Sequence, residues 1–122
     1  RQAGQRAVLG QDEDGDAAVS DKYILKGHVA VPANTEEWAR FFENIDNRRV
    51  ASTNFGEDIR VSTVFLGLDY RFGNDGPTLI FETMIFGGDF DDWQKRCSTW
   101  EEAETLHAEA CKLVTDTLAS IA

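Results

Sequence analysis

The stretch VSTVFLGLDYRFGNDGPTLIFETMIFGG, residues 61–88, decides the fold that this sequence predicts. Two dense apolar runs flank a segment rich in Gly, Asn, Asp and Pro, which is typical of two antiparallel strands joined by a turn. The second run carries one carboxylate, Glu82, near its middle. A carboxylate in an apolar strand must be paired, hydrated or protonated, so the predicted hairpin is also the first place to look for a functional site.

Side chains alternate between the two faces of a strand, so the pairing register decides which of them meet the core. With Asp69 opposite Thr78, the face expected to form the core holds Ser62, Val64, Leu66, Leu68, Leu79, Phe81, Thr83 and Ile85. The other face then holds Val61, Thr63, Phe65, Gly67, Asp69, Ile80, Glu82, Met84 and Phe86. A slip on one strand would reassign its residues. We expect this second face to be covered by a partner or a second copy, because it would otherwise expose a contiguous apolar patch.

The segments around the hairpin add helices and further strands. KYILKGHVAV predicts a first strand that stops at Pro32, RRVASTNF a second strand, and DDWQKRC a short edge strand. Gly56, Glu57 and Asp58 predict a turn into the third strand, roughly residues 59–70, and the fourth strand is expected over about residues 78–86. In ANTEEWARFFENI, Asn34 and Glu37 have the spacing of a capping box. An apolar stripe follows at Trp38, Phe41, Phe42 and Ile45. In STWEEA, Ser98 and Glu101 have the same capping-box spacing. The last helix then keeps an apolar period at Ala103, Leu106, Ala110, Leu113, Leu118 and Ile121.

This order of elements predicts an α+β fold, with an antiparallel sheet of four to five strands and two helices packed on one face. The length of 122 residues fits a single domain, which we expect over residues 21–122. Residues 1–20 lack a sustained period and are interpreted as a flexible arm or as cloning-derived residues, since the sequence begins with Arg1.

The charge balance limits the classes of partner. The 12 Lys and Arg against 22 Asp and Glu leave a formal charge of −10, which disfavours nucleic acid and anionic membranes but permits a basic protein surface. No apolar run approaches the roughly 20 residues that cross a bilayer. Cys97 and Cys111 lack zinc-type spacing and are expected to be free thiols in a reducing cytosol.

The runs VSTVFLGLD, FETMIFGG and STWEEAETLHAE, in this order, resemble a group of small proteins encoded by bacteriophages and prophages whose function is uncharacterised. The resemblance covers roughly residues 23–114. It implies a phage-encoded protein that acts in the host cytosol, where small acidic accessory proteins often inhibit host enzymes or defence systems. It brings no catalytic residue or cofactor with it.

Each acidic candidate has a functional and a structural interpretation. Glu82 is either part of a site or the holder of a structural hydrogen bond on an exposed strand face. Asp69 ends a strand and is expected to cap the turn. The acidic cluster Asp89, Asp91 and Asp92, beside Trp93, is either a solvated loop, which we favour, or a mimic of phosphate charges aimed at a basic groove.

Metal and nucleophilic chemistry find little support in the sequence. His107 and Cys111 stand at i and i+4 on a predicted helix, but two ligands are too few, and His28 is only a distant third candidate. We therefore expect a helix-face histidine and a buried thiol, with no metal and no cofactor. No Ser or Cys accompanies a recognisable general base, so no catalytic residue is predicted.

The leading hypothesis is a non-enzymatic interaction module that binds a host or phage protein and inhibits a host enzyme or defence system. A homodimer is an additional expectation, whereas direct binding to nucleic acid or membranes is not. One alternative is a protein that binds or sequesters a nucleotide-like small ligand over Glu82 and Asp69. A weaker alternative is an enzyme that uses these two carboxylates as a pair. The predicted binding residues are Phe65, Asp69, Glu82, Met84, Phe86, Asp91, Asp92 and Trp93.

Overall fold

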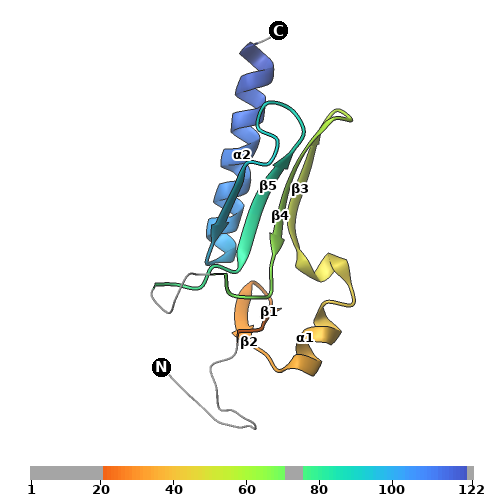
Figure 1. Ribbon diagram of the computed structural model, residues 1–122, viewed down its shortest axis with the longest axis vertical. Helices are drawn as coiled ribbons and strands as arrows, with labels where there is room; N and C mark the ends of the chain where they lie inside the picture. Colours follow the sequence, from red (N-terminus) through yellow and green to blue (C-terminus); the bar gives the residue numbers. More distant parts are fainter. Residues whose placement is uncertain (1–20, 71–75, 121–122) are drawn as a thin grey trace.

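The computed structural model describes residues 21–70 and 76–120 and confirms the α+β fold (Figure 1). The predicted arm lies outside these residues. In chain order the elements are β1 (Tyr23–Lys26), β2 (Val29–Pro32), α1 (Thr35–Phe41), a 3-10 turn η1 (Ile45–Arg48), β3 (Arg49–Phe55), β4 (Ile59–Phe65), β5 (Phe81–Phe86), β6 (Gln94–Cys97) and α2 (Trp100–Ser120). None of the helices in this part of the chain is long and apolar enough to cross a bilayer.

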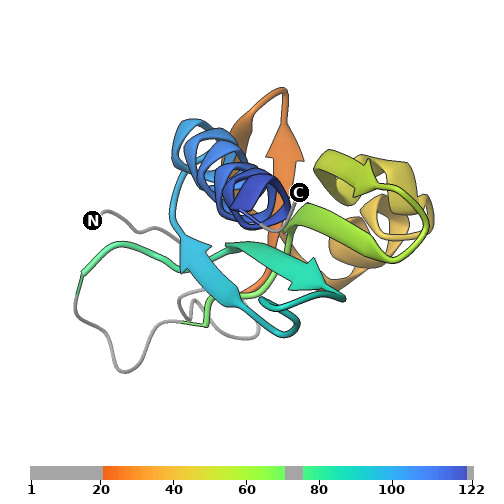
Figure 2. The same ribbon diagram turned by 90° about the horizontal axis from the view of Figure 1, so that it is seen from above.

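Strands β3 to β6 form one antiparallel sheet in the order β3-β4-β5-β6. Helix α2 runs along the strands and contacts all four of them from one side (Figures 1 and 2). A strand–turn–strand meander needs only short connections, and the turn at Gly56 between β3 and β4 agrees with the sequence. The sheet therefore has one face under α2 and one opposite face.

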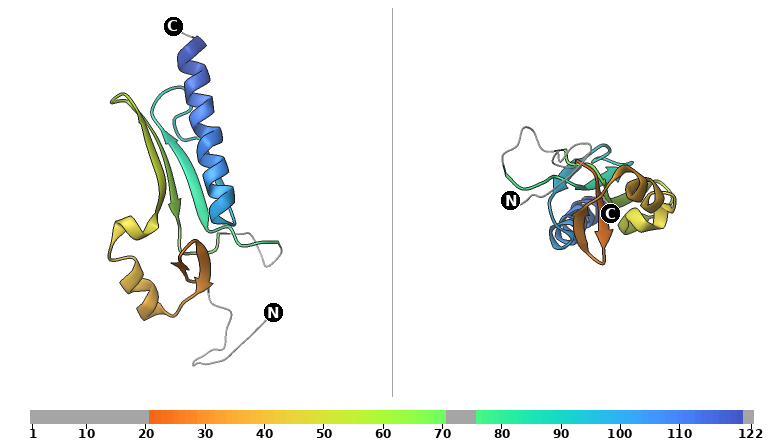
Figure 3. Two further views of the ribbon diagram at one scale, coloured as in Figure 1. Left: turned by 180° about the vertical axis from the view of Figure 1, so that it is seen from behind. Right: turned by 90° about the horizontal axis from the view of Figure 1, so that it is seen from below.

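The predicted first strand is two strands. β1 and β2 pair as an antiparallel hairpin around a two-residue turn at Gly27 and His28, with Tyr23 opposite Pro32. This hairpin and α1 lie at one end of the main sheet, not lengthwise over its face (Figure 3). The hairpin adds apolar side chains at that end of the core, among them Tyr23 and Leu25.

The predicted register of the central hairpin is wrong by one residue. Phe65 pairs with Phe81 and Thr63 with Thr83, whereas Asp69 opposite Thr78 would place each β4 residue one position away. Strand β4 ends at Phe65, and Leu68 then bridges to Lys22 instead of to β5, so the regular pairing between the two strands stops before Asp69. Because a one-residue shift exchanges the faces, Val61, Thr63 and Phe65 lie under α2.

The face assignment is confirmed for Phe81–Phe86 but is wrong for Ile80, which was expected on the second face and is 1% exposed in the core just before β5 begins. Phe81, Thr83 and Ile85 are buried under the helix, whereas Glu82, Met84 and Phe86 lie on the opposite face. The β4 half is inverted: Phe65 is 0% exposed and belongs to the core, so its predicted place in a contact surface is wrong. Register, and not composition, was the source of this error.

The core divides into two hydrophobic clusters. One contains Phe65, Ile80, Phe81, Cys97 and Ala103, and the predicted helix residues Phe41, Phe42 and Leu106 pack against it. The other contains Val61, Ile85, Ala110 and Val114. Both clusters lie between α2 and the sheet, so the apolar stripe of α2 covers most of the core.

Helix α1 begins as predicted and docks on a glycine. Asn34 and Glu37 form the reciprocal capping box. The Trp38 indole N–H donates to the Gly67 carbonyl oxygen at 3.0 Å. A Cβ at Gly67 would collide with the Phe42 ring, and its φ of +78° also favours glycine. The close approach of α1 to the end of β4 therefore depends on Gly67.

Helix α2 begins one residue later than predicted. The Glu102 backbone N–H donates to Thr99 Oγ1 at 3.1 Å, and the Thr99 N–H donates to Glu102 Oε1 at 3.2 Å. The capping box is therefore Thr99 and Glu102, with Ser98 also donating its N–H to Glu102. Adjacent Ser and Thr residues, each with a Glu three positions on, made the two boxes indistinguishable by spacing.

Candidate functional site

The sheet face opposite α2 is the first candidate site, and we call it the open face. The register and the strand alternation place on it Ser52, Asn54, Arg60, Ser62, Val64, Glu82, Met84, Phe86, Gln94 and Arg96. Within residues 21–70 and 76–120, no helix covers this face. It combines arginines, neutral polar groups and apolar side chains, so it is a mixed surface and not a second core.

Glu82 is paired by its neighbours on β6. Its carboxylate oxygen accepts a bond from Arg96 Nε at 3.0 Å and a second from the Gln94 side-chain amide. Arg96 lies directly opposite Glu82 in the β5–β6 register. The Glu82 side chain is 13% exposed, so the pair largely neutralises and shields its charge. Glu82 therefore holds structural hydrogen bonds, which is one of the two interpretations that the sequence allowed.

Two guanidinium groups stack on aromatic rings at the open face. The Arg60 guanidinium carbon lies 4.9 Å from the centre of the Phe86 ring, and that of Arg96 lies 4.6 Å from the Tyr70 ring. Phe86 is 37% exposed and Tyr70 is 46% exposed. Arg60 makes no ion pair with any residue in the described part of the chain. Stacked Arg–aromatic pairs present flat, partly apolar area together with unused N–H donors.

Asp69 and Glu82 are held by different partners. Asp69 Oδ1 accepts the backbone N–H of Leu79 at 3.1 Å, which fixes the approach of the chain to β5. Glu82 instead bonds to β6. Asp69 therefore caps the connection as predicted, whereas Glu82 is paired across β5 and β6.

The predicted acidic cluster forms the β5–β6 loop. Asp91 Oδ1 accepts the Gly87 backbone N–H at 2.7 Å, and Asp92 adopts a φ of +74° in the tight turn. Trp93 is half-buried against the second core cluster, with Lys95 Nζ 5.7 Å from the ring centre. Asp91 and Trp93 thus shape the loop, and only the outward carboxylates of the loop remain available to a partner.

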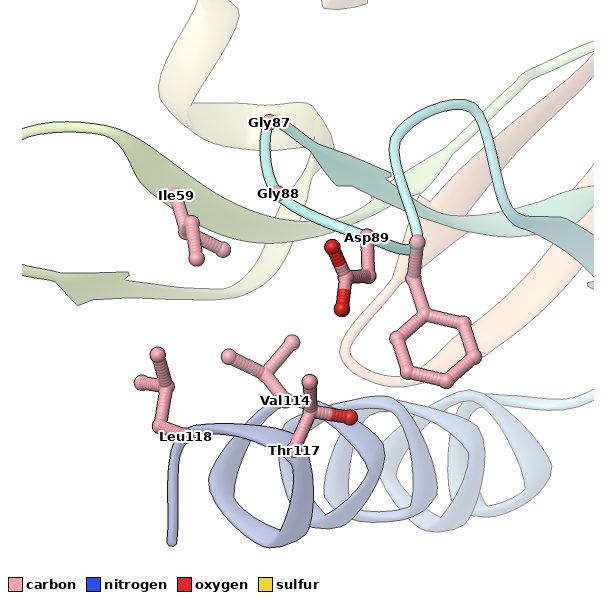
Figure 4. Close-up of a pocket in the computed structure, with 8 residues that line it drawn as sticks. Ile59, Gly87, Gly88, Asp89, Val114, Thr117 and Leu118 are labelled. Atoms are coloured by element: carbon pink, nitrogen blue, oxygen red, sulfur yellow. The ribbon is translucent and has the colours of Figure 1, made fainter. Parts of the chain in front are cut away.

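An apolar pocket of about 160 Å³ lies between this loop and α2 (Figure 4). We call it the α2 pocket. Its lining residues are Ile59, Gly87, Gly88, Asp89, Phe90, Val114, Thr117 and Leu118. No short stretch of the sequence predicts this pocket, because it forms only where a loop meets the distal half of a helix. The two adjacent glycines before the loop were the available signal.

A buried polar network at the centre of the sheet–helix interface was also missed. His107 Nδ1 lies 2.8 Å from Thr63 Oγ1, and His107 Nε2 lies 2.9 Å from Thr53 Oγ1. Thr63 Oγ1 also lies 2.7 Å from Thr83 Oγ1. Burial lowers the pKa of His107, so the neutral ring is favoured. His107 is therefore a satisfied core residue, where the sequence predicted a helix-face histidine.

The thiols are separate and show no reactive setting. Both are free, as expected, and Cys97 is buried, but Cys111, which was expected to be buried, is half-buried on α2. Burial, with a smaller contribution from Glu102, raises the pKa of Cys97 to about 11, which keeps the thiol protonated. Among residues 21–70 and 76–120, no three His, Cys, Asp or Glu side chains form a group that could hold a metal ion.

Comparisons of the chain with protein-family models, with curated proteins and with solved structures gave no significant match. The candidate sites therefore rest on geometry and chemistry alone.

Proposed function

We propose that the chain is a small protein-interaction module that binds its partner through the open face of the sheet. The observation that carries this proposal is the pair of exposed aromatic residues, Phe86 and Tyr70, each stacked by a guanidinium. Aromatic and arginine side chains dominate the energetics of protein interfaces, because they bury much area and still donate hydrogen bonds.

The charged side chains of the open face indicate which kind of partner surface it can bind. Arg60 has an unpaired charge within the described residues, whereas the charge of Glu82 is already used by Arg96. A complementary partner presents apolar side chains bordered by Asp or Glu, whose carboxylates meet Arg60 and the outer N–H groups of Arg96. The net charge of −10 opposes a densely charged polyanion such as nucleic acid, so we expect a few carboxylates placed beside apolar side chains and not a uniformly acidic surface.

The alternatives have weaker support. A nucleotide-like ligand over Glu82 and Asp69 would have to compete with the bonds that these carboxylates already accept, from Arg96 and from the Leu79 backbone N–H. A carboxylate-dependent enzyme requires Asp69 and Glu82 to act together, but each is held by a separate partner. A protein-interaction module requires only the exposed aromatic and arginine side chains that the open face already presents.

The resemblance to phage-encoded proteins suggests where this module acts. We expect the partner to be a host or phage protein in the host cytosol, with inhibition of a host enzyme or defence system as the outcome. A second copy of the chain is the other candidate for covering the same face.

The proposal is tested by capture from bacterial lysate with the wild-type chain and three variants. Arg60→Glu and Phe86→Asp change the open face, whereas Glu104→Lys changes an exposed charge on α2, on the other side of the sheet. We expect the same protein to be retained by the wild type and by Glu104→Lys, and lost with both open-face variants. Thermal melts check that each variant folds.

Two results would contradict the proposal. One is a set of captured proteins that does not change among the variants, which would place the contact elsewhere. The other is a wild-type chain that captures nothing and remains monomeric in light scattering at high concentration, since a second copy is the remaining candidate for this face.

A further inference from the structure

The α2 pocket is a second, separate surface, and the backbone keeps it open. Gly87 and Gly88 contribute no side chains to its wall, and both have positive φ. A Cβ at Gly87 would collide with the Asp58 carbonyl oxygen, so this position cannot carry a larger residue without moving the β3–β4 turn. The depression between the loop and α2 is therefore built into the way the two turns meet.

Its size matches one side chain. The aliphatic wall comes from Ile59, Val114 and Leu118, and Leu118 is itself 39% exposed at the rim. An apolar cavity of about 150 Å³ is known to hold a group the size of benzene. A volume of about 160 Å³ thus accommodates one apolar side chain of about the size of leucine or phenylalanine, and nothing much larger.

The rim has a negative charge that the chain itself does not neutralise. Asp89 lines the pocket, and its carboxylate points toward α2 (Figure 4). No residue in the described part of the chain gives Asp89 a side-chain hydrogen bond or an ion pair. Asp92 and Asp58 are exposed on the adjacent turns, and no Lys or Arg lines the pocket.

We infer that the α2 pocket binds a leucine-sized apolar side chain from a protein segment that carries Lys or Arg next to it. The apolar side chain fills the space between Ile59 and Leu118, and the neighbouring cation pairs with Asp89. This ligand is basic, whereas the partner of the open face is acidic, so the chain has two docking surfaces of opposite preference. An acidic protein with one such anchoring point can hold a basic partner segment while its open face remains available.

The test uses three end-blocked peptides, Lys-Leu-Lys, Lys-Ser-Lys and Glu-Leu-Glu, titrated to millimolar concentration against the protein. The readout is the NMR shift of the methyl groups of Ile59, Val114 and Leu118. We expect saturable shifts with Lys-Leu-Lys only, because the serine peptide lacks the apolar anchor and the glutamate peptide is repelled.

Two variants separate the apolar and the charged contributions. Thr117→Phe places a ring in the pocket and is expected to abolish the shifts. Asp89→Asn is expected to weaken binding by about two- to fivefold, the range of an exposed ion pair. Glu104→Gln removes an equal charge near the other end of α2 and is the matched control, with unchanged binding expected.

Three outcomes would overturn the inference. The first is the absence of saturable shifts at these methyl groups with Lys-Leu-Lys. The second is equal binding of Glu-Leu-Glu, which would show that the ligand needs no Lys or Arg. The third is full binding by Thr117→Phe, which would place the peptide outside the pocket. None of these results bears on the open face, whose residues are not part of the readout.

Discussion

Replacing Phe65 with alanine should destabilise the fold far more than the same replacement at Phe86. Phe65 is fully buried, and its ring centre lies 5.3 Å from that of Phe81, 6.0 Å from Phe41 and 6.2 Å from Phe42. Truncation removes the whole ring from this cluster, at a cost of about 3–5 kcal/mol. Phe86 is 37% exposed and packs on Arg60, so its truncation should cost about 1 kcal/mol.

The assays are urea denaturation, which gives the free energy of unfolding, and a thermal melt, which gives Tm, both followed by tryptophan fluorescence and circular dichroism. For a domain of this size, the loss at Phe65 corresponds to a fall in Tm of at least ~12 °C. If Phe65→Ala does not fold, Phe65→Leu supplies a smaller perturbation at the same site. Equal losses at Phe65 and Phe86, or a larger loss at Phe86, would refute the register and return Phe65 to the solvent-facing side of the sheet.

Three further predictions concern polar groups. Thr63→Val removes the hydroxyl that contacts both Thr83 and His107, and should cost about 2–4 kcal/mol in urea denaturation because two buried groups lose a partner; a neutral effect would show that the network contributes no stability. Burial lowers the pKa of His107 below its ordinary value of 6.5, so the unfolded chain binds the proton more readily. The stability from this residue should be complete above that value and fall as the pH decreases below it, seen as a lower Tm at about pH 5 than at about pH 7.5; a Tm that rises on acidification would contradict the buried neutral ring. Glu82→Gln and Arg96→Gln should each cost about 1 kcal/mol or less, with a favourable coupling in a double-mutant cycle; zero coupling would mean that the pair is not formed in solution.

Much of the fold could be predicted because its signals are local. The capping box at Asn34 and Glu37 and the turn at Gly56 both appear where their spacing indicated. The alternation on β5 placed Phe81 in the core and Glu82 outside it, because a run of six residues leaves little ambiguity in period. Local patterns of this kind depend on neighbours in the sequence, so they can be read without the tertiary structure.

The register could not be predicted because it depends on a connection whose length the alternation does not specify. Ending β4 at Phe65 instead of continuing it toward Asp69 changed the partner of every β4 residue. The core network had a weaker signal. Thr63 and Thr83 alternate with large apolar residues, and His107 follows Ala103 by four positions, so all three occupied core positions in their elements. Their contact with one another required three elements to be placed together.

The candidate sites likewise combine residues that the sequence could identify with contacts that only the tertiary structure shows. Glu82 and Asp69 were singled out by composition, and the structure assigns each a specific hydrogen-bonding partner. The stacking of Arg60 on Phe86 crosses two strands and depends on the corrected register. The α2 pocket requires a loop and a distant helix to meet, which no short stretch of sequence specifies.

The central claim, that the open face binds a protein, can be tested at a single residue. Met84 is the only methionine of the sequence and lies on the open face between Ser62 and Gln94. Incorporation of photo-methionine therefore places a crosslinker at that point, apart from any initiator residue added for expression. On irradiation in host lysate, we predict a discrete crosslinked species that disappears with Arg60→Glu and persists with Glu104→Gln. The absence of any crosslink through Met84, or a product that both variants retain equally, would contradict the claim.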